Sequence, residues 1–251
     1  MPITALSYLH DTYQSEQVAQ VLEIAQDEEG TYLVVNQSIF YPQGGGQPSD
    51  AGVLIFAVGP VTAATSPAEF PQSARLEVQS VRFKEGQVRL YGPWDPEWEG
   101  QWVLQQIDLA TRLAHARLHT AGHLIHAVMT ELDPSLQAQK GYHFPQGPYV
   151  EFAGVPNLEP DALMAQLNAA LQAAIQAALP IKSEFVTLEE LHARKAMIPA
   201  AFPEGKPLRV VQIGHYQPVP CGGTHLASTA ELGTLQIRKI KSKAGTTKIS
   251  Y

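Results

Sequence analysis

The sequence predicts an α+β protein in two parts, a small β-rich domain followed by a mixed α/β domain. Before about residue 108, short β-like runs alternate with Gly and Pro turns, as is typical of a small barrel or sandwich. Helical apolar spacing follows over 107–132 and returns over 160–179. We therefore expect an N-terminal small β-barrel domain over 1–108 and an α/β two-layer domain over 109–251.

The first domain contains four runs rich in strand-forming residues, separated by turn residues. The stretch 65–71 combines Pro with small polar residues and is expected to form an exposed loop tip. The expected strands are 31–35, 52–58, 75–83 and 87–90.

The second domain is expected to contain three helices. The longest carries apolar residues at helical spacing up to Leu132, and the Ala-, Leu- and Gln-rich stretch that follows Pro160 is amphipathic. Thr187 and Glu190 have the spacing of a capping box for a short third helix, which Pro199 keeps from continuing. Further strands are expected at 209–213 and 233–250.

Length and composition are those of a water-soluble globular protein. A chain of 251 residues with 45% hydrophobic residues suffices for one large or two small domains. The N-terminus lacks the pattern of a signal peptide, and no window approaches the roughly 18 apolar residues of a membrane span. We expect a cytoplasmic protein that does not contact membranes. The single cysteine, Cys221, excludes an internal disulfide.

Two short motifs, far apart in the chain, each hold a pair of possible metal ligands four residues apart. His119 and His123 lie in the first helix, where this spacing puts both imidazoles on one face. Cys221 and His225 flank a Gly-Gly pair, which allows a tight turn. Three imidazoles and one thiolate form a complete tetrahedral set for zinc.

Other interpretations of these residues remain open. A lone cysteine is often a small buried hydrophobe, and a lone histidine is often a satisfied core or surface residue. His115 lies one turn before His119 and could share its face. We interpret His115, His126 and His143 as structural residues or as supports for the ligands.

Two familiar zinc classes fit poorly. The zinc-protease motif has Glu directly after its first His, as general base, whereas this chain has Thr120 after His119. The two ligand pairs are also separated by far more than the dozen or so residues of a self-contained zinc finger. The metal is expected to join distant parts of one domain.

The segments 119–126 (HTAGHLIH) and 221–225 (CGGTH) resemble the paired zinc motifs of the editing domain of alanyl-tRNA synthetase and of its free-standing relatives, the AlaX proteins. The segment 40–50 (FYPQGGGQPSD) resembles the glycine-rich motif of the accessory domain in that family. The resemblance continues in the residues 139–141, in the strand 208–214 and in the closing hairpin 231–243.

The resemblance implies a zinc-dependent aminoacyl-tRNA deacylase that acts without ATP. The implied substrate is mischarged tRNA(Ala), chiefly Ser-tRNA(Ala) and also Gly-tRNA(Ala), with Ser-tRNA(Thr) as a competing substrate. The sequence contains nothing like an aminoacylation domain, so a free-standing protein is expected. Residues 150–152 read Val-Glu-Phe where full synthetases have Arg-Asp-Phe, which is closer to the AlaX branch.

The ester that joins an amino acid to tRNA is already activated. A metal-activated water and a well-placed amino acid therefore suffice, and no catalytic side chain is predicted beyond the zinc ligands. Four protein ligands nevertheless describe a closed structural site, whereas catalysis needs an open position. Two other classes stay open: a zinc-containing tRNA-binding module without turnover, and a zinc hydrolase of small esters or amides.

Substrate contacts are predicted at three places. Gln139 falls where the family has a polar residue facing the amino acid, and Thr120 is a weaker candidate for the same pocket. The turn of Gly44, Gly45 and Gly46 could bring backbone N–H groups close to the tRNA end, although a plain wide turn is the alternative.

The third predicted contact is the C-terminal segment. No acidic residue occurs from 232 to 251, in a chain whose formal net charge is −7. This segment can bind phosphates, and its alternative is a solvated edge strand protected by lysines. The basic residues predicted to contact the substrate are Arg238, Lys239, Lys241 and Lys243.

Overall fold

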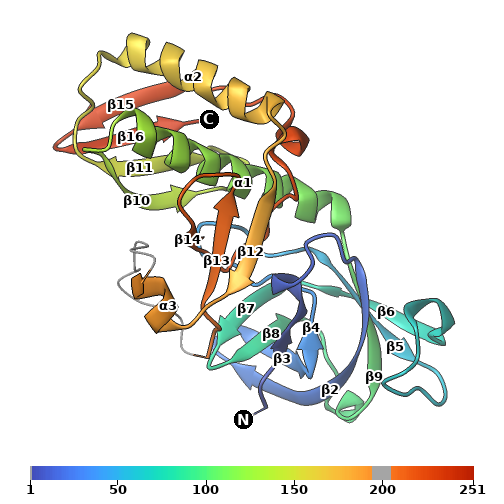
Figure 1. Ribbon diagram of the computed structural model, residues 1–251. Helices are drawn as coiled ribbons and strands as arrows, with labels where there is room; N and C mark the ends of the chain where they lie inside the picture. The colour runs from blue at the N-terminus through green and yellow to red at the C-terminus, as the bar shows by residue number, and fades with distance from the viewer. Residues whose placement is uncertain (1, 194–204) are drawn as a thin grey trace. The chain divides into compact units, whose positions relative to one another are not determined.

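The structure is a computed structural model and describes residues 2–193 and 205–251. The chain divides into two compact units (Figure 1). The first comprises Met1–Gly44, Pro48–Ala114 and Pro203–Lys206, and the second comprises Gly45–Gln47, His115–Phe202 and Pro207–Tyr251. In the part of the chain that is described, no helix is long and apolar enough to cross a membrane.

The first unit is built on one seven-stranded antiparallel sheet with the order β6-β5-β9-β2-β3-β8-β7. Its strands are β2 (Glu16–Asp27), β3 (Gly30–Val35), β5 (Gly52–Ala57), β6 (Gln72–Val78), β7 (Ser80–Lys84), β8 (Gln87–Tyr91) and β9 (Trp102–Ile107). The smaller elements are β1 (Ala5–Leu6), paired in parallel with β4 (Gln37–Ser38), and the 3-10 turns η1 (Ser7–Leu9), η2 (Pro67–Glu69) and η3 (Pro96–Trp98).

The observed sheet differs from the expected barrel in one respect. Among the described residues the pairing leaves β6 and β7 at opposite ends of the strand order, so no hydrogen-bonded ladder closes the sheet. The expected strand 75–83 is divided between these two strands at Gln79, because β6 pairs with β5 whereas β7 pairs with β8. The other three expected strands of this unit are present.

A buried ion pair fixes the start of the long helix to the rest of the first unit. Arg112 and Asp50 are fully or nearly fully buried, and the Arg112 Nε donates to Asp50 Oδ1 over 2.7 Å. Arg112 also donates to the carbonyl of Thr12 (3.2 Å) and to that of Ile39, and Asp50 accepts from the amide of Tyr41 (2.6 Å). The charges are thus paired and hydrogen-bonded, as buried charges require.

The second unit contains two sheets and most of the long helix. A four-stranded antiparallel sheet has the order β10-β11-β16-β15, and a three-stranded one has the order β12-β13-β14. The strands are β10 (Gln137–Tyr142), β11 (Tyr149–Ala153), β12 (Ile181–Phe185), β13 (Arg209–Ile213), β14 (Val219–Pro220), β15 (Lys239–Lys243) and β16 (Thr246–Ser250). The helices are α1 (Leu109–Leu132), α2 (Pro160–Gln176), α3 (Leu188–Ala193) and the 3-10 turn η4 (Thr229–Leu232).

Helices α1 and α2 lie alongside the four-stranded sheet (Figure 1). Val150, Phe152 and Ile249 are buried on the face of this sheet that meets the helices, and the ring of Phe152 lies 6.4 Å from that of His126 in α1. Alternate residues of the same strands point to the opposite face. The sheet therefore has one packed face and one open face.

The three expected helices are confirmed. Helix α3 has the expected capping box, since the Thr187 amide donates to Glu190 (2.7 Å) and the Glu190 amide donates to Thr187 Oγ1 (3.1 Å). Pro199, expected to limit this helix, lies outside the described residues. The expected strand 233–250 is a hairpin of β15 and β16 that starts only at Lys239.

We predict that Arg112→Met destabilises the protein by about 3–5 kcal/mol, because it leaves the Asp50 carboxylate buried without a partner. Urea unfolding followed by circular dichroism measures this difference in the free energy of unfolding. Arg75→Met, at an exposed position of β6, is the matched control and should change it by less than about 0.5 kcal/mol. Equal effects of the two substitutions would contradict the assigned role of the ion pair.

Candidate metal centre

Helix α1 places two imidazoles one turn apart. The ring centroids of His119 and His123 are 5.0 Å apart. The helix forms here because Ala121, Leu124 and Ile125 supply a buried apolar side, and all three are at most 3% exposed. The packing of that side fixes the rotation of α1, and with it the direction of both histidines.

The second pair stands on the turn that follows β14. Arg209 in β13 holds this turn, since its Nη1 donates to the carbonyls of Cys221 (3.1 Å) and Gly223 (3.0 Å). A Cβ on Gly223 would lie 2.1 Å from Cε1 of His119. Only glycine therefore lets the turn approach the helix this closely.

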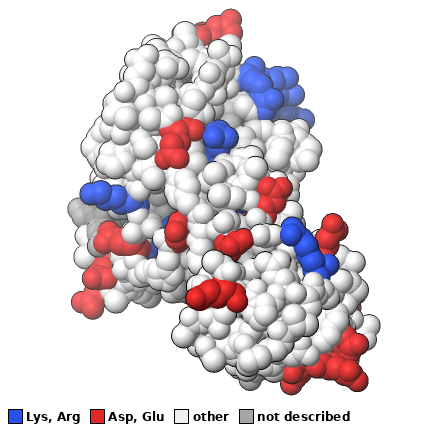
Figure 2. Space-filling view, turned by 90° about the vertical axis from the view of Figure 1, so that its right-hand side faces the viewer, with Lys and Arg blue, Asp and Glu red and all other residues white. Residues whose placement is uncertain are grey.

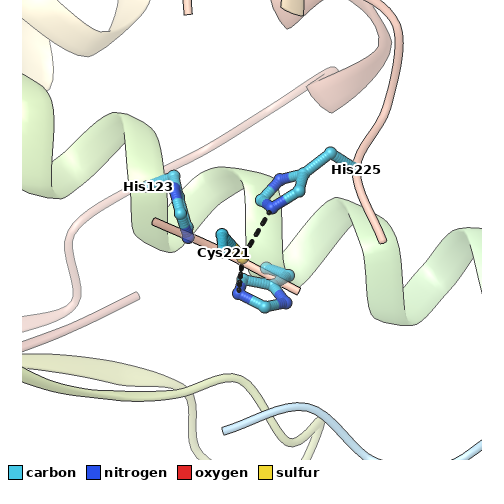
Figure 3. Close-up of side chains that lie close together, drawn as sticks. His123, Cys221 and His225 are labelled. Carbon is cyan, nitrogen blue, oxygen red and sulfur yellow. Dashed lines mark hydrogen bonds between the residues drawn. The ribbon is translucent and has the colours of Figure 1, made fainter. Parts of the chain in front are cut away.

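The four predicted ligands meet at one point. The Cys221 Sγ lies 3.5 Å from Nε2 of His119 and 3.3 Å from Nε2 of His225, and the ligand atoms of these residues and His123 all lie within 4.8 Å of one another. In Figure 3 the side chains of His123 and His225 point toward the sulfur from two sides. In a tetrahedral zinc site, neighbouring ligand atoms lie roughly 3.3–3.6 Å apart, given bonds of about 2.0 Å to nitrogen and 2.3 Å to sulfur.

Gln47 fixes the protonation of the first imidazole. Its Oε1 accepts from the backbone amide of Thr224 (3.1 Å), and its Nε2 donates to Thr224 Oγ1 (2.8 Å). The atom that faces His119 Nδ1 at 2.7 Å is therefore the amide oxygen, so Nδ1 carries the proton and donates. The other ring nitrogen, Nε2, is left with a lone pair directed at Cys221.

Thr120 has a similar role toward His225. Its hydroxyl lies 3.1 Å from His225 Nδ1 and accepts from the amide of Leu226 (3.1 Å). Partners of this kind orient metal-binding imidazoles in known metal sites. The predicted role of Thr120 in contacting the substrate stays a prediction, and its hydroxyl is engaged by these two groups.

His143 makes a further contact with His119. The ring of His143 stacks on it, with centroids 4.5 Å apart. The Tyr251 hydroxyl donates to the carbonyl of Leu118 (2.9 Å), so the 2.6 Å contact with His143 Nδ1 is a hydrogen bond donated by the imidazole. A Cβ on Gly122 would lie 2.2 Å from this ring, so His143 needs glycine in the helix beneath it.

Burial keeps the three candidate histidine ligands neutral. The pKa values of His119, His123 and His225 lie well below the ordinary value because the rings are desolvated, and neighbouring basic groups lower them further. Neutral imidazoles are the form that binds metal. Nδ1 of His123 is buried without a hydrogen-bond partner, so nothing in the described chain competes for its lone pair or proton. The donors present therefore fit a metal ion with nitrogen and sulfur ligands.

The other histidines lie outside this group. His115 is buried one turn before His119, and His126 is part of the wall of a cavity of about 220 Å³. The metal-ligand candidate His123 also contributes to that wall. The remaining lining residues are Ala127, Thr130, Glu131, Val211, Ile213, Tyr216, Gln217, Pro218 and Val219.

The residues predicted to contact substrate lie in different settings. Gln139 is exposed at a bulge in β10 and is not among the residues that line the cavity. Gly45 and Gly46 have positive φ angles of 54° and 77°, and Gly44 accepts a hydrogen bond from the Tyr41 hydroxyl (2.9 Å).

This glycine turn presents Gln47 to the metal centre. The Gly46 carbonyl accepts from the amide of His143 (2.8 Å), and a Cβ on Gly46 would lie 2.2 Å from the carbonyl oxygen of Gly141. The sequence predicted substrate contacts for the glycines of this turn and no role for Gln47. The available signal was a polar residue between the glycines and a proline, within the motif 40–50.

The basic C-terminal residues line the exposed edge of the four-stranded sheet. Lys239, Lys241 and Lys243 alternate along β15 and are exposed. Arg238 precedes the strand and donates to the carbonyl of Tyr251. Strand β15 is therefore both an edge strand of the sheet and a row of exposed positive charges.

Comparison with known proteins gives consistent matches. Residues 208–248 match the family model described as "Threonyl and Alanyl tRNA synthetase second additional domain". Alanine–tRNA ligases are similar over most of this chain: that of Pyrobaculum neutrophilum is 30% identical over 96% of the chain, and that of Frankia alni is 32% identical over 89%. The chain spans about a quarter of each relative, 26% and 24% respectively. The resemblance drawn from the motifs is confirmed.

We predict that Gln47→Leu weakens zinc binding by about 10- to 100-fold, because it removes the acceptor that orients His119. Competition with a chromophoric chelator measures the affinity. Cys221→Ala, which removes a ligand, should weaken binding further, and Gln139→Leu serves as an exposed control without effect. Unchanged affinity in Gln47→Leu would contradict this role.

The pH dependence of the metal-free protein should reflect His143. Burial lowers the pKa of this side chain to about 4, against about 6.5 when unfolded. Below about pH 6.5 the unfolded chain binds a proton at His143, whereas the folded chain does not. The contribution of His143 to the free energy of unfolding is therefore complete above pH 6.5 and is lost as the pH falls toward 4. We predict that His143→Asn flattens the fall in the free energy of unfolding between pH 6.5 and 4, measured by urea titration. An unchanged dependence of the free energy of unfolding on pH would contradict this role of His143.

Proposed function

We propose, on the premise that this chain is a relative of the editing domain of alanyl-tRNA synthetases, that it hydrolyses the ester bond of mischarged tRNA(Ala). Ser-tRNA(Ala) is the proposed main substrate and Gly-tRNA(Ala) the second. The observation that carries the proposal is the convergence of His119, His123, Cys221 and His225 within 4.8 Å, in a chain with these relatives. The proposed setting is the cytoplasm, where tRNA is charged.

The proposed metal is zinc, one ion per chain, held by these four side chains. Three imidazoles and one thiolate suit this ion. When bound, zinc supplies Lewis-acid chemistry that suits ester hydrolysis. We further propose residues 109–251 as the deacylase domain and 1–108 as an accessory domain.

The chain's own side chains prepare the donor atoms. Gln47 holds the proton of His119 on Nδ1, and Thr120 lies at the corresponding nitrogen of His225. The Gly223 amide donates to Cys221 Sγ (3.2 Å), which favours the thiolate. Cys221 in this arrangement is a ligand and does not act as a nucleophile.

The cavity beside His123 is the proposed place for the reacting end of the substrate. Its wall combines apolar side chains with Thr130, Glu131 and His126, which can hydrogen-bond to an amino acid or a ribose. A pocket that hydrogen-bonds the serine hydroxyl discriminates against alanine, since its own polar groups would otherwise be left unpaired. The contacts of Gln139 and of Gly44, Gly45 and Gly46 with the substrate remain predictions.

One observation favours a second candidate function. A zinc ion with four protein ligands is typical of structural sites, whose coordination is closed. A tRNA-binding module with structural zinc would have the same four residues. Turnover separates the two functions.

We predict that the zinc-loaded protein removes serine from Ser-tRNA(Ala) faster than glycine from Gly-tRNA(Ala), and that it spares Ala-tRNA(Ala) by at least about 100-fold. Loss of radiolabelled amino acid from each tRNA measures the rates, with Ser-tRNA(Thr) as a fourth substrate. Cys221→Ala should lose activity, whereas Gln14→Ala, in the first unit, should keep it. Equal rates on all the tRNAs indicate a nonspecific esterase, and binding without turnover indicates the module.

A further inference from the structure

The open face of the four-stranded sheet has an unusual composition. Alternation along the strands and the register between them place its side chains in rows that cross the sheet. One row runs Tyr142, Tyr149, Ser250, Lys239, and the next runs Lys140, Glu151, Lys248, Lys241. We call the surface formed by these two rows, with Lys243 and Phe144, the open face.

Three aromatic rings stand face to face on this surface. The ring of Tyr142 stacks on Phe144 with centroids 4.6 Å apart and planes at 15°, and on Tyr149 at 5.3 Å and 22°. The Nζ of Lys248 lies 3.4 Å from the centre of the Tyr149 ring and closes that end of the stack. All three rings are only partly buried, so the stack borders on solvent. We call these three rings the aromatic stack.

The charge of the open face differs from that of the whole chain. It carries five exposed lysines and one carboxylate, that of Glu151, in a protein of formal net charge −7. Among the described residues none of these lysines forms an ion pair. Figure 2 shows Lys and Arg side chains gathered in a patch at the end of the protein where β15 and β16 lie. The lysines are Lys140, Lys239, Lys241, Lys243 and Lys248.

The aromatic end of the open face adjoins the metal centre. Tyr142 directly precedes His143, whose ring stacks on His119. Ser250, in the same row, directly precedes Tyr251, whose hydroxyl contacts His143 over 2.6 Å. The row therefore ends at β10, and the residue after Tyr142 contacts His119 from the other face of the sheet.

We propose that the open face binds unpaired nucleotides, with a base on the face of Phe144 that is turned away from Tyr142, at the end of the aromatic stack, and with phosphates on the lysines. Stacking needs free base faces, which a single strand offers and a duplex does not, and the unpaired lysines complement the charge of the phosphates. Resting on the proposed function, this assigns the open face to the single-stranded acceptor end of tRNA. It names the ligand class as single-stranded RNA, independently of the amino acid carried.

The test uses a fluorescently labelled RNA of about twelve nucleotides, without self-complementarity and without an amino acid, and the same strand annealed to its complement as a blunt duplex. Fluorescence anisotropy should show tighter binding of the single strand to the zinc-loaded protein. Phe144→Ala should weaken binding about 5- to 100-fold, as expected for the loss of one stacked base. Tyr149→Ala should weaken it less, because Tyr142 and Lys248 already cover the two faces of the Tyr149 ring. Phe185→Ala, an exposed aromatic in β12, is the matched control and should bind as the unchanged protein does.

Zinc content and the unfolding midpoint of each variant show that the fold persists. Phe144→Tyr keeps the ring and should retain binding, which shows that the aromatic face is what the RNA needs. Lys239→Ala with Lys241→Ala should weaken binding and flatten its salt dependence by roughly 0.7 per lost phosphate contact. A folded Phe144→Ala variant that binds like the control would overturn the proposal, as would equal affinity for the duplex. Absence of deacylation with binding retained would refute the proposed function alone.

Discussion

The second unit depends on the burial of several imidazoles around one thiol. Polar atoms taken out of water must find partners, and here almost all of the atoms that point outward do. Gln47 accepts from His119, Thr120 lies at His225, and the Gly223 amide donates to the sulfur. The atoms that point inward face one another, at 3.3–3.5 Å where Cys221 meets His119 and His225. A cation at their centre would suit this arrangement, because neutral imidazoles and a thiolate are the forms that bind metal.

A second constraint is that the backbone approaches the rings of His143 and His119 very closely. At each of these contacts the backbone residue is a glycine. The ring of His143 lies against the helix at Gly122 and against the strand at Gly141, where a Cβ would fall 2.2 and 2.3 Å from its atoms. Gly223 makes the same allowance for His119, and Gly46 for the carbonyl of Gly141. The glycines of the motifs thus have a steric role that comes before any contact with a substrate. They let α1, β10 and two loops converge on a volume that side chains would otherwise fill.

Around this rigid centre the second unit offers two different surfaces. The cavity beside His123 is small and mostly apolar, which suits the reacting end of a substrate. The open face of the four-stranded sheet is broad, aromatic and basic, which suits a polyanion with exposed bases. The cavity shares His123 with the candidate metal centre, and the open face borders it at the end of β10, where His143 points to the other side of the sheet and stacks on His119. A small cavity and a broad aromatic, basic surface therefore lie on either side of a few side chains of α1 and β10.

The sequence by itself determined the helices, the ligand candidates and the resemblance to the editing domain, because each depends on local patterns: four residues between two histidines on a helix, or a capping box at Thr187. It did not predict β2 and β9, whose mixed polar composition hides strands that only pairing with their neighbours defines. It also overlooked Gln47 and Tyr251, since nothing near them in the chain shows that they reach His119 and His143. The aromatic stack joins Tyr142 to Tyr149 through a register between two strands, and that register exists only once the sheet forms. Contacts within a few residues are fixed by the geometry of the chain, whereas contacts between distant segments are decided by packing, which is a property of the tertiary structure alone.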